Sequence, residues 1–226
     1  MRGASFPSPS ASEAGDEGEQ LQSTRPDFGP IVAQADAQVQ QAIAQHGVGK
    51  VGILFSGMDE VAPLLVSAST HPALGSVRWY AADASARSEV LIANPQAAAF
   101  AARVGFPNAI FGLEQGARDV WAPLVERVKA RSGQEAGGFA LAVYDAVWVV
   151  ARAYIASGAT KDLAKLERAF TTAASTGYGA TGWTVLNAAG DRKYGDFDFW
   201  APRETSGAIR WARVARYETR TGRLIR

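Results

Sequence analysis

Apolar residues recur at helical spacing from Ile31 to Ile43, and the pattern stops at Gly47. Residues three and four apart lie on one face of an α-helix, so an amphipathic helix is predicted here. The next segments read as a strand in KVGILFSG, a helix in DEVAPLLVSASTHP, a strand in SVRWYAAD and a helix in NPQAAAFAARVG. This β-α-β-α order with short links predicts a parallel sheet with helices on its faces, and the apolar first strand is expected to be buried.

A third strand is predicted from Ala109 to Leu113, and the pattern then becomes helical. The three predicted helices are ARDVWAPLVERVKARSG, FALAVYDAVWVVARAYIASG and KDLAKLERAFTTAAS. After Gly177 the alternation favours strands, in GWTVLN, YGDFDFW and IRWARVARYET. The pattern as a whole predicts an α/β protein that ends in a β-hairpin.

Composition adds few constraints. The 226 residues are 47% hydrophobic with a formal charge of +1, which gives no general case for a nucleic-acid or membrane partner. Seven arginines fall between Arg203 and Arg226, and they fit either solubilising charge or a phosphate-binding patch. No stretch reaches the roughly 18 apolar residues of a membrane span. Residues 1–25 are rich in Ser, Pro, Gly and Glu, so we expect disorder there and no secretory signal in the chain as written.

Catalytic chemistry has little support in the sequence. The chain has no cysteine, and neither His46 nor His71 has a partner at metal-ligand spacing, so a capping or surface role competes with any role as ligand or base. The run GVGKVG at 47–52 precedes a strand instead of linking a strand to a helix, as a phosphate loop would. We therefore expect no enzyme activity, no catalytic residue, no metal and no cofactor.

Two loops of small residues follow the first and second predicted strands, FSGMDE and YAADAS. Ligands of open α/β sheets bind outside the carboxyl ends of the strands. Asp83 is the lone acid of the second loop, and its carboxylate could accept charge-assisted hydrogen bonds from an ammonium group. The alternative is that Asp83 caps the helix that follows.

Four segments in order, VGILFSGMDEVAPLLVSASTHPALGSVRWYAADA, VGFPNAIFG, VYDAVWVVARAYIASG and TGWTVLNAAGDRKYGDFDFW, resemble the type I periplasmic solute-binding proteins. The leucine/isoleucine/valine-binding group of ABC importers is the most similar branch, and the resemblance covers about residues 27–201. It implies two α/β lobes that close on an amino acid or a similar small solute. It also implies an ABC permease as partner, a periplasmic or extracellular location, and no cofactor.

The resemblance assigns three ligand-binding residues. Asp83 matches the acid that holds the ligand's ammonium, although the two glycines of the family's Gly-Ser-Asp-Gly pattern are Ala81 and Ala84 here. Met58 falls where relatives have an aromatic residue that faces the cleft. Phe139 matches an aromatic residue of the side-chain pocket, and a core position in its helix is the alternative.

The resemblance covers only part of the family's fold, because the first lobe and the opening strands of the second are not matched. It divides the chain into a disordered segment 1–25, an α/β portion of the second lobe 26–133, helices 134–176 that relatives pack on the first lobe, and C-terminal strands 177–226. A sensory or regulatory fragment and a gene fragment without function are the alternatives to a truncated importer component.

The helix at 138–157 presents a row of apolar residues that relatives bury against the first lobe, namely Phe139, Val143, Val147, Trp148, Val150 and Ile155. Leaving such side chains exposed forgoes roughly 25 cal/mol for each Å² that burial would remove from water. Three outcomes are open: the helix packs on the rest of the chain, a partner covers it, or the chain is poorly stable.

Overall fold

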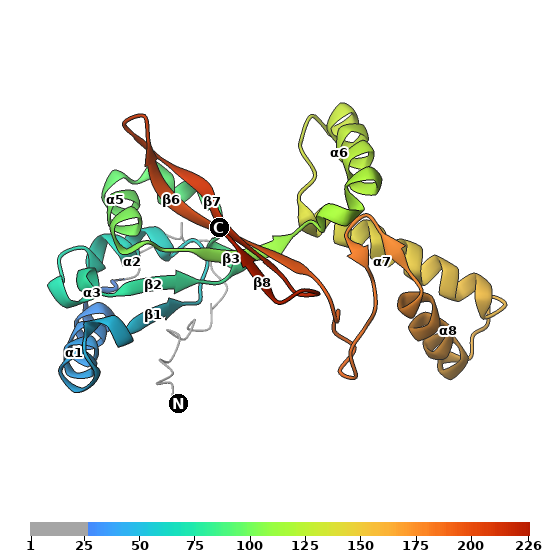
Figure 1. Cartoon of the computed structure of the whole chain (residues 1–226), viewed down its shortest axis with the longest axis horizontal. Helices are drawn as coiled ribbons and strands as arrows, with labels where there is room; N and C mark the ends of the chain where they lie inside the picture. Colours follow the sequence, from blue (N-terminus) through green and yellow to red (C-terminus); the bar gives the residue numbers. More distant parts are fainter. Residues whose placement is uncertain (1–26) are drawn as a thin grey trace, which may run out of the picture.

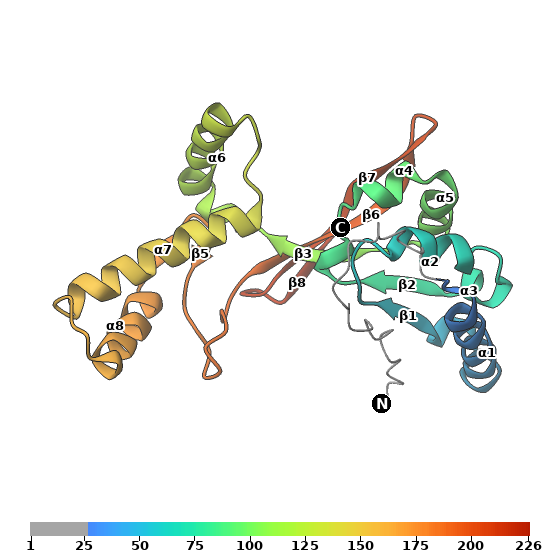
Figure 2. The same cartoon turned by 180° about the vertical axis from the view of Figure 1, so that it is seen from behind.

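The computed structural model describes residues 27–226, and the segment predicted to be disordered, 1–25, lies outside the described residues. The molecule is elongated (Figures 1 and 2), with an α/β unit at one end and a smaller, mainly helical unit at the other. Strand β3 (Asn108–Gly112) and the C-terminal strands run between these two ends.

Six strands form one sheet in the order β1-β2-β3-β6-β7-β8. Their bounds are β1 Gly52–Phe55, β2 Arg78–Ala81, β3 Asn108–Gly112, β6 Asp196–Thr205, β7 Ala208–Glu218 and β8 Arg223–Ile225. The first three strands are parallel, and β6 adds to β3 antiparallel, as do β7 and β8 in turn. The predicted α/β fold, a parallel sheet flanked by helices and followed by a C-terminal hairpin, is confirmed.

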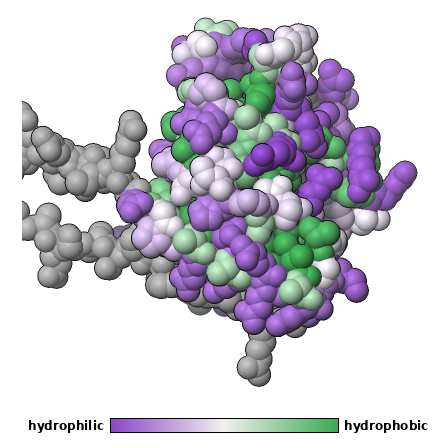
Figure 3. Space-filling view, turned by 90° about the vertical axis from the view of Figure 1, so that its left-hand side faces the viewer, coloured by the Kyte–Doolittle hydropathy of each residue, from purple (hydrophilic) through white to green (hydrophobic). Residues whose placement is uncertain are grey.

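Helices pack on one face of the parallel strands and form the main core with them. They are α1 (Gly29–His46), α2 (Val61–Ala68), α3 (Pro72–Ser76), α4 (Glu89–Ala93) and α5 (Pro95–Val104), with short 3-10 turns η1 (Val48–Lys50) and η2 (Asp83–Ser85). Phe55 of β1 and Trp79 of β2 are buried in this core, and Trp79 meets Phe100 of α5 edge to face at 5.6 Å. The outer end of this unit is mostly hydrophilic (Figure 3).

The opposite face of β1 and β2 is uncovered. Leu54 and Tyr80 are register partners on this face, with 74% and 48% of their surfaces exposed. The prediction of a buried first strand is therefore wrong for one face, because within residues 27–226 no helix packs there. Parallel sheets are normally covered on both faces.

The helical unit has a separate, smaller core. It contains the turn η3 (Gln115–Ala117), helices α6 (Arg118–Ser132), α7 (Gly138–Ala156) and α8 (Leu163–Ser175), and the two-residue strands β4 (Tyr178–Gly179) and β5 (Gly182–Trp183). Leu124 and Val125 of α6 pack with Leu141 of α7 and with Ala180, the residue after β4. Strand β5 covers only Gly182–Trp183, so the strand predicted over 182–187 is shorter than expected. Beyond β5, an isolated β-bridge joins Leu186 to Arg192.

Helix α7 leaves the predicted apolar face open to solvent. All six of its predicted residues are exposed, and Val147, at the middle of the helix, has 62% of its surface in solvent. Packing on the rest of the described chain, the first of the three outcomes, is therefore not observed. By length and composition alone α7 could also cross a membrane. The helix nevertheless carries Asp145, a buried carboxylate bonded to the β4–β5 turn.

Candidate functional site

The two predicted binding loops leave the same edge of the sheet. Phe55 ends β1 and Ala81 ends β2, and these residues are register partners in the parallel pair. The loop that carries Met58 and the loop that carries Asp83 therefore start side by side. Met58 and Asp83 are both exposed, so a solute could reach them from this edge.

Buried hydrogen bonds fix the position of the Asp83 loop. Ser85, two residues after Asp83, donates from Oγ to Asn108 Oδ1 at 2.7 Å, and Asn108 Nδ2 donates to the Phe106 carbonyl at 2.9 Å. Ser85 and Asn108 are almost completely buried at the start of β3. Polar groups in such a place are stable only when they are paired, so this contact holds the turn in one conformation.

Asp83 does not cap the helix that follows. Ser88 caps α4, accepting a hydrogen bond from the Leu91 backbone N–H at 3.3 Å. Within residues 27–226 the Asp83 carboxylate has no hydrogen-bond partner and lies at the surface on the turn η2. The capping alternative is therefore removed, and the carboxylate is available to a ligand.

The same loop carries a cation close to Asp83 in sequence. Arg87 has a left-handed backbone with φ of 61°, which is uncommon for a residue other than glycine. Its guanidinium lies 4.9 Å from the ring centroid of Trp200 on β6, a cation–π contact. Trp211 of β7 donates to the Ser88 carbonyl at 3.0 Å. The aromatic residues of the C-terminal hairpin thus support the loop that holds Asp83.

Phe139 lies beyond this edge, near the start of α7 in the helical unit. Asn108 pairs with the last residue of β2, so β3 continues past the edge, and Phe111 lies about 10 Å farther along at 3.3 Å per residue. Gly138 starts α7 directly against Phe111, because a Cβ at this glycine would lie 2.9 Å from the Phe111 carbonyl oxygen. Phe139 follows with 54% of its surface exposed, so the alternative of a core position is removed.

Truncation of Phe139 is expected to leave the stability of the chain within about 0.5 kcal/mol, as for other surface substitutions. Leu141, two residues further along α7 and only 1% exposed, is the matched control, and Leu141→Ala should cost about 2–5 kcal/mol. Urea unfolding of Phe139→Ala and Leu141→Ala measures both effects. A loss from Phe139→Ala as large as the loss from Leu141→Ala would show that Phe139 is a core residue.

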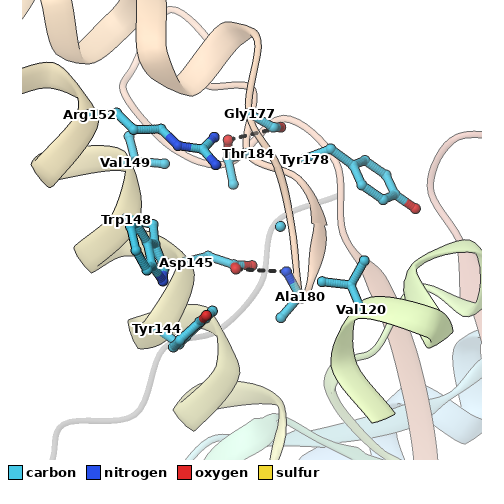
Figure 4. Close-up of a pocket in the computed structure, with 11 residues that line it drawn as sticks. Val120, Tyr144, Asp145, Trp148, Val149, Arg152, Gly177, Tyr178, Ala180 and Thr184 are labelled. Atoms are coloured by element: carbon cyan, nitrogen blue, oxygen red, sulfur yellow. Dashed lines mark hydrogen bonds between the residues drawn. The ribbon is translucent and has the colours of Figure 1, made fainter. Parts of the chain in front are cut away.

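A polar cluster that the sequence analysis missed anchors α7. Asp145 is 4% exposed and accepts a hydrogen bond from the backbone N–H of Ala180 at 2.7 Å (Figure 4). It also accepts hydrogen bonds from the backbone N–H of Thr181 at 2.7 Å and from the Thr181 hydroxyl. Gly179 must be glycine, because a Cβ there would overlap the Asp145 carboxylate. The available signal was that Asp145 is the lone charge in the apolar stretch 138–151.

Arg192 completes this cluster from the other side of the β4–β5 turn. Its guanidinium donates to the Thr181 hydroxyl, to the Thr181 carbonyl at 2.7 Å and to the Trp183 carbonyl at 3.0 Å. Burial lowers the pKa of Arg192, and the carboxylates of Asp145 and Glu114 act in the opposite direction. The guanidinium also lies 5.3 Å from the Phe111 ring centroid, which connects this cluster to β3.

Beside this cluster is a hollow of about 270 Å³ (Figure 4). Tyr144, Trp148 and Arg152 point into it from α7, Val120 closes it from α6, and Tyr178 lies on its far side. The hollow is smaller than the range of about 300–1,000 Å³ that is usual for ligand pockets. It contains none of the three predicted site residues.

The histidines give no sign of a catalytic or metal site. His46 ends α1, and His71 precedes α3 with its Nδ1 3.7 Å from Asp36 Oδ2. Within residues 27–226, no group of three or more His, Asp or Glu side chains is placed to hold a metal ion.

Comparison with known proteins supports the fold and leaves the activity open. No protein-family model matches the chain. The uncharacterized protein MJ1266 of Methanocaldococcus jannaschii is 29% identical in an alignment of 209 residues that covers 88% of this chain and 47% of that protein. The chain therefore spans about half the length of the curated relative that it matches.

Solved structures show the same half coverage. The leucine-binding protein LivK of Thermotoga maritima matches with a TM-score of 0.52 and 18% identity, over 88% of this chain and 48% of that protein. An ABC transporter substrate-binding protein of Desulfitobacterium hafniense in complex with Leu matches with a TM-score of 0.50 and 19% identity, over 80% of this chain and 48% of its own length. The described chain is thus a mixed α/β structure that resembles half of a periplasmic-binding-protein fold, and these binding proteins are not enzymes.

Proposed function

We propose that this chain is one half of a solute-binding protein that captures an amino acid or a similar small molecule for an ABC-type importer. The observation that carries the proposal is the free carboxylate of Asp83 at the carboxyl edge of a parallel sheet. The loop that carries it is fixed by the buried hydrogen bond between Ser85 and Asn108. An acid at this place fits the ammonium group of an amino acid. A half match to a binding protein solved with Leu supports this ligand class.

In this proposal the exposed site residues act together. Asp83 holds the ammonium, Met58 contacts the solute from the neighbouring loop, and Phe139 supplies an apolar surface for its side chain. The carboxylate of the solute would be held by the half of the fold that this chain does not match. The ABC permease would bind the complete protein, with both halves of the fold present.

The division of the chain at residues 25, 133 and 176 is also a proposal. The α/β portion would be part of the second lobe, and the helices from 134 to 176 would pack against the first. The two separate hydrophobic clusters support a change of role along the chain. Helix α6 lies before residue 133 but packs with α7 in the second cluster, so the clusters favour a division that begins before α6.

The test is to join this chain, through a flexible linker, to the half of the Desulfitobacterium hafniense protein that it does not match. Calorimetric titration with a panel of amino acids, leucine included, should give micromolar binding to the joined protein. A joined protein that melts cooperatively but binds no amino acid would contradict the proposed ligand class. Circular dichroism melting separates that result from a failure to fold.

A further inference from the structure

Two segments of the chain connect the α/β unit to the helical unit, and they pass through one place (Figures 1 and 2). The first leaves β3 at Gly112, and the second leads from β5 back to Asp196, the first residue of β6. Gly112 and Asp196 are register partners, so the two connections lie side by side. The turn after β7 lies against them, because the Gly195 backbone N–H donates to Thr219 Oγ1 at 3.0 Å. We call this place the joint, and it consists of residues 112–116, 195–196 and 218–221.

The joint surrounds a cavity of about 220 Å³ whose wall carries three carboxylates. Each comes from a different segment, since Glu114 follows β3, Asp196 begins β6 and Glu218 ends β7. Asp196 is only 8% exposed, so little of it reaches water. Burial and like charges both disfavour the ionised form of a carboxyl group. The cavity is therefore a place where protonation of an acid is favourable.

Positive charge near the cavity offsets the three acids only in part. Arg220, the one arginine among the described residues that line the cavity, lies 3.5 Å from Glu114. Its side chain is 55% exposed, so water screens this pair. Arg216 is buried, but it is already bonded to Asp198 at 3.0 Å and to the Leu113 carbonyl at 2.8 Å. With all three acids ionised, the wall of the cavity is negative.

Glu114 connects this cavity to the helical unit. A Cβ at Gly182, the first residue of β5, would overlap the Glu114 carboxylate, so the two are in close contact. The Trp121 indole N–H on α6 donates to the Glu114 carbonyl at 3.1 Å. The other titratable groups that face Glu114 from this unit are Tyr178 and Arg192. A change of charge in the cavity therefore acts on the segment that holds the helical unit.

We infer that the joint is a proton-sensitive hinge, in which a protonated Asp196 fixes the two units relative to each other and an ionised Asp196 loosens them. Protonation removes one of three like charges and adds a hydrogen-bond donor to a cavity wall rich in acceptors. Ionisation restores the repulsion between segments that belong to the two connections. Hinges of this kind move whole units through a few residues at the ends of elements. The inference does not rest on the proposed function, because it concerns the described chain alone.

The direction of the pH effect follows from the surroundings of Asp196. Burial raises the pKa of Asp196 above its ordinary value of 3.8. The Arg216 guanidinium and the Thr219 backbone N–H oppose this effect, while the carboxylates of Glu114 and Glu218 add to it. A raised pKa in the folded state gives a stabilisation that is complete below the ordinary value and is lost as the pH rises through the raised one. Acidification from neutral pH should therefore tighten the joint.

Spin labels on the two units test this inference in the full chain. The chain has no cysteine, so Lys50→Cys at the end of η1 and Lys161→Cys before α8 place one label on each unit, both at exposed positions. Pulsed electron paramagnetic resonance measures the distribution of distances between the labels. Its width should fall at least twofold from pH 7.5 to pH 4.5. In Asp196→Asn, where residue 196 is neutral at every pH, it should be narrow at both pH values.

Two further variants make the test specific. Glu218→Gln removes one neighbouring charge and should narrow the distribution at pH 7.5, by less than Asp196→Asn does. Asp191→Asn changes an exposed acid in the same connection and should behave as the unmodified chain. The inference is overturned if the width does not change with pH, or if Asp191→Asn narrows it as much as Asp196→Asn. It is also overturned if Asp196→Asn, or Glu218→Gln where Asp196→Asn fails to fold, stays as broad at pH 7.5 as the unmodified chain.

Discussion

Replacing Asp145 with alanine is expected to destabilise the chain by about 3–5 kcal/mol, the range for breaking a buried charged contact by removing one partner. The Asp145 carboxylate is the acceptor for two backbone N–H groups and one hydroxyl in the β4–β5 turn. Without it these donors are buried and unpaired, and each unpaired group costs about 1–3 kcal/mol. Arg192 would also lose the nearby negative charge that offsets its burial.

Two further variants serve as controls for Asp145→Ala. Asp145→Asn keeps the shape and one acceptor oxygen, so it should cost less than alanine. Glu126→Ala removes an exposed acid from α6 and should change stability by less than about 0.5 kcal/mol. Chemical denaturation followed by circular dichroism measures all three. A loss from Asp145→Ala no greater than the loss from Glu126→Ala would show that the cluster does not hold α7 to the turn.

The second large effect is expected at Asp83, in the protein joined to a complementary half. Asp83→Ala should weaken amino-acid binding by at least about 100-fold, because removing one partner of a desolvated charge pair costs about 2–5 kcal/mol. The melting temperature should hardly change, since the Asp83 side chain is exposed and without a hydrogen-bond partner in the described chain. Titration calorimetry of the variant measures the loss. Unchanged affinity would show that the ammonium is held elsewhere.

Ser85→Ala provides the positioning control for Asp83. It removes the hydrogen bond to Asn108 that fixes the loop while leaving the carboxylate in place. It should therefore lower both stability and affinity, whereas Asp83→Ala lowers affinity alone. Equal effects of both variants on stability would mean that Asp83 has a structural role.

The sequence predicted most of the fold because its elements are set by local patterns. The apolar spacing from Ile31 to Ile43 lies within α1, and Asn94 and Pro95 begin α5 where a cap and a first-turn proline are favoured. The strand predicted over 182–187 was too long, because this segment is held by Arg192 and Thr184 instead of by a neighbouring strand. Such side-chain contacts are not visible in an alternating pattern.

The candidate site was only partly predictable. The loops that carry Asp83 and Met58 were predicted to be close because parallel strands bring their carboxyl ends to one edge. The binding role of Met58 came from the resemblance alone, and the binding roles of both residues stay predictions. The distance of Phe139 from that edge depends on how far β3 extends beyond β2, which is a matter of strand register. The role of Asp145 depends on a turn 35 residues away, so the lone acid in an apolar helix gave a signal but no partner. The uncovered face of β1 and β2 could not be predicted from the sequence, because it depends on which elements pack against the sheet in three dimensions.

Titration of the 226-residue chain alone with amino acids tests most directly the central claim, that this chain carries half of a binding site. A carboxylate as exposed as Asp83 forms an ion pair worth about 0–1 kcal/mol in water. Such a pair cannot offset the several kcal/mol lost when a small molecule is fixed in place. We predict no binding tighter than about millimolar, which corresponds to roughly 4 kcal/mol. Micromolar binding of leucine or another amino acid by this chain alone would contradict the claim.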